Sequence, residues 1–140
     1  MENKRKISDL IPYKIKKGEV FVFLQKRTKD AKNYPDMFGF FGGHIEEGES
    51  PEEAFKREIK EELNFVPEHA VYFEEDEFDS QLKHTFLLEV GDDFESKITV
   101  LEGQYGKWMN EQEASLVKIV DVDKIVLQKF FDSFRNSKST

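Results

Sequence analysis

The stretch Gly42–Phe65, with the sequence GGHIEEGESPEEAFKREIKEELNF, is the most informative part of this chain. Ser50 is followed by Pro51 and, three positions after the serine, by a glutamate, which together predict a capping box with proline in the first turn. A helix is therefore expected to begin at Pro51 and to run through Leu63. It should end at Asn64, since asparagine tolerates the left-handed conformation used at helix C-termini.

Three glutamates share one edge of this predicted helix. At roughly 100° per residue, Glu58, Glu61 and Glu62 fall within one arc beside a narrow apolar stripe. Like charges three or four positions apart destabilise a helix by roughly 0.2–0.5 kcal/mol per pair, and acids near the C-terminus oppose the helix dipole. Such a cluster predicts a positive partner.

The ligand chemistry of the chain favours a hard divalent cation as that partner. Mg²⁺ selects carboxylate, carbonyl and water oxygens and keeps positions open for substrate phosphates. The chain has no cysteine and three scattered histidines, His44, His69 and His84, so a zinc site is disfavoured. We expect Mg²⁺, with Mn²⁺ as a substitute.

Glycines and one arginine complete the pattern around the helix. Gly42 and Gly43 follow the strand-like run FGFF and let the backbone approach a ligand closely. Gly48 is expected to turn the loop toward the helix. Glu49 and Arg57 are expected to pair across the junction between loop and helix.

The spacing of these residues resembles the Nudix box. Gly43 is followed by five residues, Glu49, seven residues and then REIKEELNF from Arg57 onward, so the chain resembles the Nudix hydrolase family. Two positions depart from the usual pattern. Asn64 replaces a glycine, which is conservative for the backbone, and Phe41 replaces a proline, which changes the stiffness of the loop before Gly42.

A second likeness lies downstream, where LEGQYGKWM at 101–109 resembles the EGQ-x-G-x-W-M stretch of MutT-type Nudix members. There the glutamate is a further metal ligand or activates water, a role that the resemblance carries to Glu102. The alternative is an ordinary acid in a turn beside a glycine.

The family resemblance implies that water cleaves a phosphoanhydride bond with the help of bound metal. The implied metal ligands are the Gly42 carbonyl and the carboxylates of Glu58, Glu61, Glu62 and Glu102. These four glutamates and Arg57 form the candidate catalytic set. The general base stays open between Glu58 and Glu102.

The short chain and the downstream likeness favour a nucleoside triphosphate pyrophosphatase that releases a monophosphate and pyrophosphate, with oxidised purine nucleotides as candidates. The alternatives are hydrolysis of ADP-ribose, another nucleotide sugar or a dinucleoside polyphosphate. A module that binds a nucleotide without cutting it is a further alternative, although such modules usually lose the box glutamates that this chain retains.

Three residues are candidates for substrate contact. Arg27 lies among several lysines after the strand-like VFVFLQ and offers the bidentate geometry suited to phosphate. Gly43 belongs to the loop over the phosphates. Asp123 lies near the expected start of the last helix, where such enzymes read the base; capping that helix is its alternative role.

Length and composition predict one Nudix domain over residues 1–140, with about residues 1–6 and 135–140 frayed. A net charge of −8 disfavours nucleic acid polymers and anionic membranes as partners. The N-terminal MENKRK lacks the apolar stretch of a signal peptide, so a cytoplasmic location is expected. The expected partner is a small nucleotide, for a monomer or homodimer.

Periodicity indicates mixed α and β structure. Extended segments are expected on both sides of a turn at 16–19, at 37–41, and as a pair at 71–79 and 82–90. An acidic loop at 91–96, a short helix at 111–116 and a helix from 122 to 134 follow. With the family resemblance, this order implies an α/β/α sandwich around a central mixed sheet.

Overall fold

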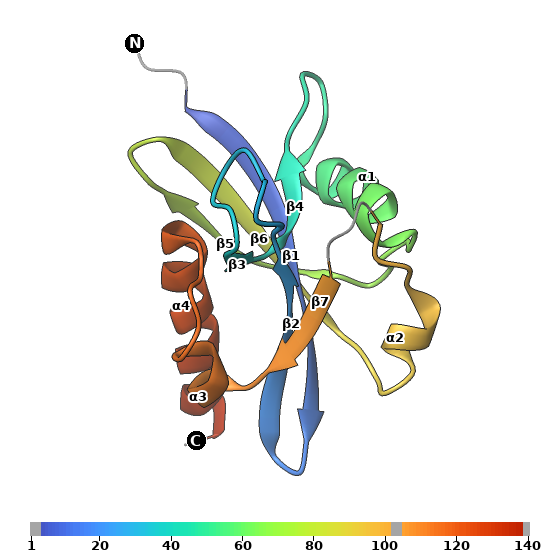
Figure 1. Ribbon diagram of the computed structural model, residues 1–140, viewed down its shortest axis with the longest axis vertical. Coiled ribbons are helices and arrows are strands. Elements are labelled where there is room, and N and C mark those ends of the chain that lie inside the picture. Colours follow the sequence, from blue (N-terminus) through green and yellow to red (C-terminus); the bar gives the residue numbers. More distant parts are fainter. Residues whose placement is uncertain (1–3, 102–104, 139–140) are drawn as a thin grey trace.

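A mixed seven-stranded sheet lies between two helical layers in the computed structural model of the protein, which describes residues 4–101 and 105–138 (Figure 1). The strands are β1 (Arg5–Lys16), β2 (Glu19–Lys26), β3 (Phe38–Gly39), β4 (Phe41–His44), β5 (Val71–Glu77), β6 (Gln81–Glu89) and β7 (Tyr105–Met109). The helices are α1 (Pro51–Leu63), α2 (Phe94–Lys97), α3 (Glu111–Ala114) and α4 (Asp121–Lys138). The predicted α/β/α sandwich is confirmed.

Strand β1 is the centre of the sheet. Along one edge it pairs in parallel with β6, from Arg5 opposite Gln81 to Tyr13 opposite Glu89. Along its other edge it pairs antiparallel with β4 and then with β2. Lys17 and Gly18 connect β1 and β2 with positive φ angles of 52° and 78°, which suit the twist of a two-residue hairpin.

Helix α1 has the bounds that the sequence predicts. The Ser50 hydroxyl accepts the Glu53 backbone N–H at 3.1 Å, and the Glu53 carboxylate accepts the Ser50 N–H at 2.9 Å. Asn64 ends the helix in the left-handed region, with φ 50° and ψ 46°. Both predicted caps are therefore confirmed.

Each helical layer covers its own core. The α1 side of the sheet buries Leu10, Phe23, Phe41, Phe55, Ile59, Leu63, Phe86, Leu88 and Phe94. The α4 side buries Ile11, Val22, Leu24, Phe38, Phe40, Met109, Ala114, Ile119, Val126, Leu127, Phe130 and Phe131. Because side chains alternate along β1, neighbouring residues such as Leu10 and Ile11 serve opposite cores.

The structure differs from the sequence prediction in several places. The extended run at 37–41 is two strands, because β3 pairs with β2 while β4 pairs with β1. A helical turn, α2, begins within the predicted acidic loop and ends just after it at Lys97, with Phe94 buried in the α1-side core. Regular structure also reaches into both ranges predicted to fray, since β1 begins at Arg5 and α4 runs to Lys138.

None of the helices within the described residues combines the length and the apolar character needed to cross a membrane.

Candidate active site

Arg57 ties the loop before α1 to the helix. Its guanidinium donates to both carboxylate oxygens of Glu49, at 2.8 and 3.1 Å, and to the His44 carbonyl at 2.9 Å. It also donates to Glu58 at 2.9 Å. The hydrogen bond to Glu49 raises the pKa of Arg57, and the pKa of Glu49 is lowered in turn. The predicted pairing of Glu49 with Arg57 is confirmed.

Glu62, in the last turn of α1, faces the glycine segment of β4, which comprises Gly42 and Gly43. Its carboxylate accepts the Gly42 backbone N–H at 2.9 Å, and Gly42 itself has φ 141°. Burial raises the pKa of Glu62 to about 8, and the nearby carboxylates of Glu58 and Asp9 add to the rise. Without a cation, this position therefore resists ionisation at neutral pH.

Glu58 packs directly against Gly43. A Cβ atom at Gly43 would lie 2.6 Å from the Glu58 carboxyl carbon, so a side chain there would displace that carboxylate from its present position. Burial raises the pKa of Glu58 although Arg57 opposes the rise. Glu61, whose side chain is 59% exposed, lies 3.6 Å from Arg57 and is free to reorient toward a ligand.

These donors fit a hard divalent cation by their chemistry. Glu58 and Glu62 are partly buried carboxylates with raised pKa values, and a cation would relieve the repulsion between them. Among residues 4–101 and 105–138, no three acidic or histidine side chains converge on one point as metal ligands. Glu58 instead pairs with Arg57, and Glu62 accepts the Gly42 N–H.

Phe41, which stands where many Nudix sequences have proline, is a core residue. It is 0% exposed, pairs with Leu10 across to β1 and stacks on Phe23 with ring centroids 5.6 Å apart. Packing on the α1 side thus holds the segment before Gly42, in place of the stiffness of a proline ring.

A buried ion network that the sequence analysis missed lies behind the glycines. Lys83 of β6, only 2% exposed, pairs with Asp9 of β1 and, at 2.7 Å, with Asp123 of α4. Burial raises the pKa of Asp9 to about 7, opposed by Lys83. For Lys83, attraction to Asp9 and Asp123 outweighs burial, and the pKa is raised. The signal available in the sequence was a single charge inside each of two apolar strands.

The predicted substrate residues have different surroundings. Asp123, 6% exposed, accepts the Phe40 backbone N–H at 3.0 Å in addition to pairing with Lys83. It is the third residue of α4, which begins at Asp121, so it does not cap that helix. Arg27 donates to the Asn33 carbonyl at 2.7 Å within the loop after β2. Gly43 lies beside Glu58, within the acidic site.

Glu102 lies outside the described residues, so its predicted role stays a prediction. The chain just before it is held at the end of α1. The Thr99 N–H donates to the Leu63 carbonyl at 2.9 Å, and the Leu101 N–H donates to the Glu62 carbonyl at 3.0 Å.

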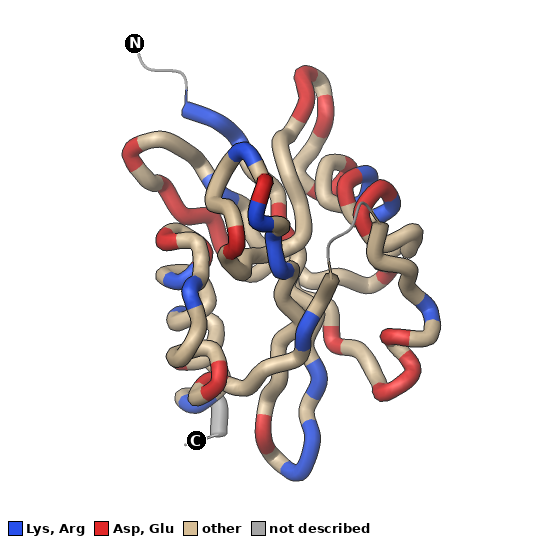
Figure 2. Tube along the Cα trace, in the orientation of Figure 1, with Lys and Arg blue, Asp and Glu red and all other residues tan. Residues whose placement is uncertain are grey.

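Charge is unevenly distributed around this site. Figure 2 shows acidic positions in the loop before α1, while α1 itself and the loop that follows β2 carry both signs. There, Lys26 donates to the Asp36 carbonyl at 2.9 Å and lies over the Phe38 ring. Lys26 also forms an ion pair with the Asp36 carboxylate at 3.1 Å, so a partner within the same loop holds this cation.

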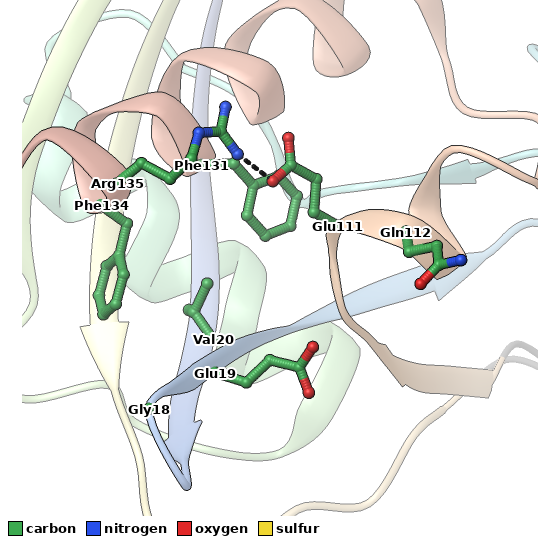
Figure 3. Close-up of a pocket in the computed structure, with 8 residues that line it drawn as sticks. All are labelled: Gly18, Glu19, Val20, Glu111, Gln112, Phe131, Phe134 and Arg135. Carbon is green, nitrogen blue, oxygen red and sulfur yellow. Dashed lines mark hydrogen bonds and ion pairs between the residues drawn. The ribbon is translucent and has the colours of Figure 1, made fainter. Parts of the chain in front are cut away.

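A separate cavity of about 430 Å³ lies between the β1–β2 turn, α3 and α4 (Figure 3). Its apolar wall is made by Val20, Phe131 and Phe134, and Arg135 is paired with Glu111 at its rim. None of its lining residues belongs to α1 or to the glycine segment. It is therefore distinct from the acidic site.

The sequence comparisons agree with this geometry. The NUDIX domain family matches residues 8–133 of the chain. The 8-oxo-dGTP diphosphatase of Escherichia coli (strain K12) is 36% identical over 90 residues, which make up 64% of this chain and 69% of that protein.

Solved structures share the fold. A structure of MutT, from work on Aliivibrio salmonicida and Vibrio cholerae, has a TM-score of 0.68 and 24% identity, covering 89% of this chain and 96% of that one. The NUDIX domain of Shewanella oneidensis NrtR, complexed with ADP ribose, has a TM-score of 0.75 and 13% identity. The match covers 100% of this chain and 91% of that one. At these identities the likeness shows the fold alone.

Proposed function

Because this chain belongs to the Nudix family and is a MutT-type pyrophosphohydrolase, we propose that it hydrolyses a nucleoside or deoxynucleoside triphosphate to a monophosphate and pyrophosphate. An oxidised purine nucleotide is the favoured substrate, on the strength of the relative named 8-oxo-dGTP diphosphatase. The proposed partner is therefore a small nucleotide. A cytoplasmic location and a monomeric or dimeric state remain predictions.

The observation that carries this proposal is the pair of partly buried carboxylates beside the two glycines. Glu62 accepts the Gly42 N–H, and Glu58 fills the space that a side chain at Gly43 would need. Burying two acids side by side is unfavourable unless a cation or a proton compensates. Arg57 offsets part of the charge on Glu58, whereas a divalent cation bound by both carboxylates would offset the charge on Glu58 and Glu62 together.

The residues have separate roles in the proposed reaction. Glu58, Glu61, Glu62, Glu102 and the Gly42 carbonyl would hold Mg²⁺, for which Mn²⁺ could substitute. When bound, the metal lowers the pKa of its water and neutralises charge on the phosphates. Arg57 holds the loop against α1, so that the Gly42 carbonyl and the glutamates keep their relative positions.

Proton removal from the attacking water falls to Glu58 or Glu102. Glu58 has a pKa raised by burial, which brings it closer to the working pH of a general base. Arg27 and Gly43 are the proposed phosphate contacts, and Asp123 the proposed base contact. Since Asp123 is paired with Lys83, a base would have to share or displace that partner.

Hydrolysis of ADP-ribose, another nucleotide sugar or a dinucleoside polyphosphate is the alternative within the same chemistry. A non-catalytic sensor module is the alternative outside it, and the NrtR domain complexed with ADP ribose has the same fold. The retained glutamates at positions 49, 58, 61 and 62 favour hydrolysis.

One assay separates these functions. The protein is incubated with Mg²⁺ and nucleoside triphosphates, 8-oxo-dGTP, ADP-ribose or a dinucleoside polyphosphate, and released pyrophosphate and monophosphates are measured. Turnover of 8-oxo-dGTP that EDTA abolishes is the expected result. Binding of any of these ligands without turnover, at saturating Mg²⁺ or Mn²⁺, would instead establish the sensor module.

A further inference from the structure

We propose that Lys83 is a positioning residue that fixes the segment Gly39–Gly42, and with it the Gly42 carbonyl, for metal binding. The inference rests on the proposed function, in which that carbonyl is a metal ligand. Lys83 lies on β6 in the central sheet, on the face that α4 covers, and is one of the largest fully buried side chains of the protein.

Both carboxylates that Lys83 neutralises contact this segment. Asp123 accepts the Phe40 N–H at 3.0 Å, and one of its oxygens would lie 2.8 Å from a Cβ atom at Gly39. Asp9 lies so close to Gly42 that a Cβ atom there would overlap its carboxylate. Lys83 also places its ammonium 5.1 Å from the centre of the Phe40 ring.

The segment is therefore held from two sides. On the α4 side, Lys83 anchors Asp9 and Asp123; on the α1 side, Glu62 accepts the Gly42 N–H. Loss of the lysine would leave two buried carboxylates without their shared cation. They would repel each other or take up protons, and the backbone they hold would shift. Partners that orient metal ligands in this way typically contribute about 10–100-fold to metal affinity.

Nearby charges allow a matched control. Lys129 of α4 pairs with Asp76 and, at 3.4 Å, with Glu74, both on β5. It lies over the same face of the sheet. Among the described residues, however, no hydrogen bond or ion pair joins Asp76 or Glu74 to the segment Gly39–Gly42. Lys129→Met therefore removes an ion pair from this face without releasing Gly42.

The experiment measures Mn²⁺ binding to the protein without substrate, by the electron paramagnetic resonance signal of unbound Mn²⁺, together with Tm in EDTA. Lys83→Met is expected to raise the Kd for Mn²⁺ about tenfold or more, whereas Lys129→Met lowers Tm and leaves the Kd unchanged. In turnover, Lys83→Met should raise the half-saturating Mg²⁺ concentration, with kcat largely recovered at saturation. Lys83→Arg, which keeps the charge, should restore most of the affinity.

If Lys83→Met fails to fold, the double variant Lys83→Met/Asp9→Asn is measured in its place. It removes one buried charge of each sign, so no single charge is left without its partner. A folded Lys83→Met protein, or a folded double variant, with the parent's Kd overturns the inference. So does an equal loss of affinity in Lys129→Met. A parent that binds no Mn²⁺ overturns the proposed function as well, whereas a binding parent with unaffected Lys83 variants overturns this inference alone.

Discussion

At the level of single residues, Glu62 combines a stability cost with a functional role. Its carboxyl group is partly buried, and burial raises its pKa to about 8. Residues that serve a site in this way often lower the stability of the fold. The Gly42 N–H contact sets its orientation.

Glu62→Gln should therefore raise the Tm of the metal-free protein at alkaline pH, and it should lower turnover by at least the roughly 10–100-fold that loss of an outer-shell partner costs. The amide oxygen can still accept the Gly42 N–H, but the buried charge and the metal ligand are gone. Calorimetry in EDTA and initial rates with 8-oxo-dGTP measure the two effects. Glu52→Gln, on the exposed first turn of the same helix, should leave the rate unchanged. Turnover of Glu62→Gln at the parent rate would remove Glu62 from the metal site.

At Gly43, the nearby Glu58 side chain, and not a left-handed backbone conformation, limits which residues can be accommodated. Gly43→Ala should displace the Glu58 carboxylate, since the added Cβ would lie 2.6 Å from it, and kcat should fall. Gly48→Ala is the contrasting variant. No atom lies within 4 Å of its added Cβ, but φ is 82°, so it should cost about 1 kcal/mol of stability through backbone strain. Circular dichroism melts and initial rates should thus separate the two; a parent-like kcat in Gly43→Ala would contradict the packing argument.

Among the secondary-structure elements, α1 is the helix whose bounds the sequence predicts best, because the residues that begin and end it lie within the helix or directly beside it. The capping box, the proline and Asn64 are all local signals, and the structure has the same bounds. The division of residues 38–44 into β3 and β4 was not predictable in this way. It depends on pairing with two different strands, β2 and β1, which no local pattern encodes.

Ser50→Ala should lower the free energy of unfolding by about 1 kcal/mol, because the Glu53 N–H loses its acceptor. Urea denaturation measures the change. Ser50→Asp should retain the parent stability, since aspartate caps equally well. Equal losses in both variants would show that packing, not capping, fixes the start of α1.

At the level of the whole molecule, buried acids link stability to pH. The folded pKa of Glu62, about 8, lies above its ordinary value of 4.5, and that of Asp9, about 7, lies above 3.8. Each group therefore favours folding most when protonated, below its ordinary pKa. That contribution is lost as pH rises through the folded pKa.

The metal-free protein should consequently lose several degrees of Tm between about pH 6 and pH 9. Mg²⁺ or Mn²⁺ should reverse most of the loss at the alkaline end, because the metal replaces the proton on Glu62. Scanning calorimetry with EDTA or with metal tests both statements. A metal-free Tm that is flat or rises over this range would contradict the burial of these carboxyls.

Long-range contacts set the limit of what the sequence could predict at this scale. The acidic helix and the arginine that holds its loop could be predicted because they lie within one continuous segment, Gly42–Phe65. The network of Asp9, Lys83 and Asp123 was not, because its members are separated by most of the chain and meet only across β1, β6 and α4. A charge in an apolar strand indicates that some partner exists, but not which one.

The parallel pairing of β1 with β6 bears on how the chain is made. During synthesis, the hairpin of β1 and β2 can close early, whereas the other edge of β1 waits until Glu89 has left the ribosome. The nascent protein then carries an open, hydrogen-bonding strand edge while the 73 residues from Lys17 to Glu89 are added. Chaperone dependence of this chain should accordingly be greatest before its sixth strand emerges.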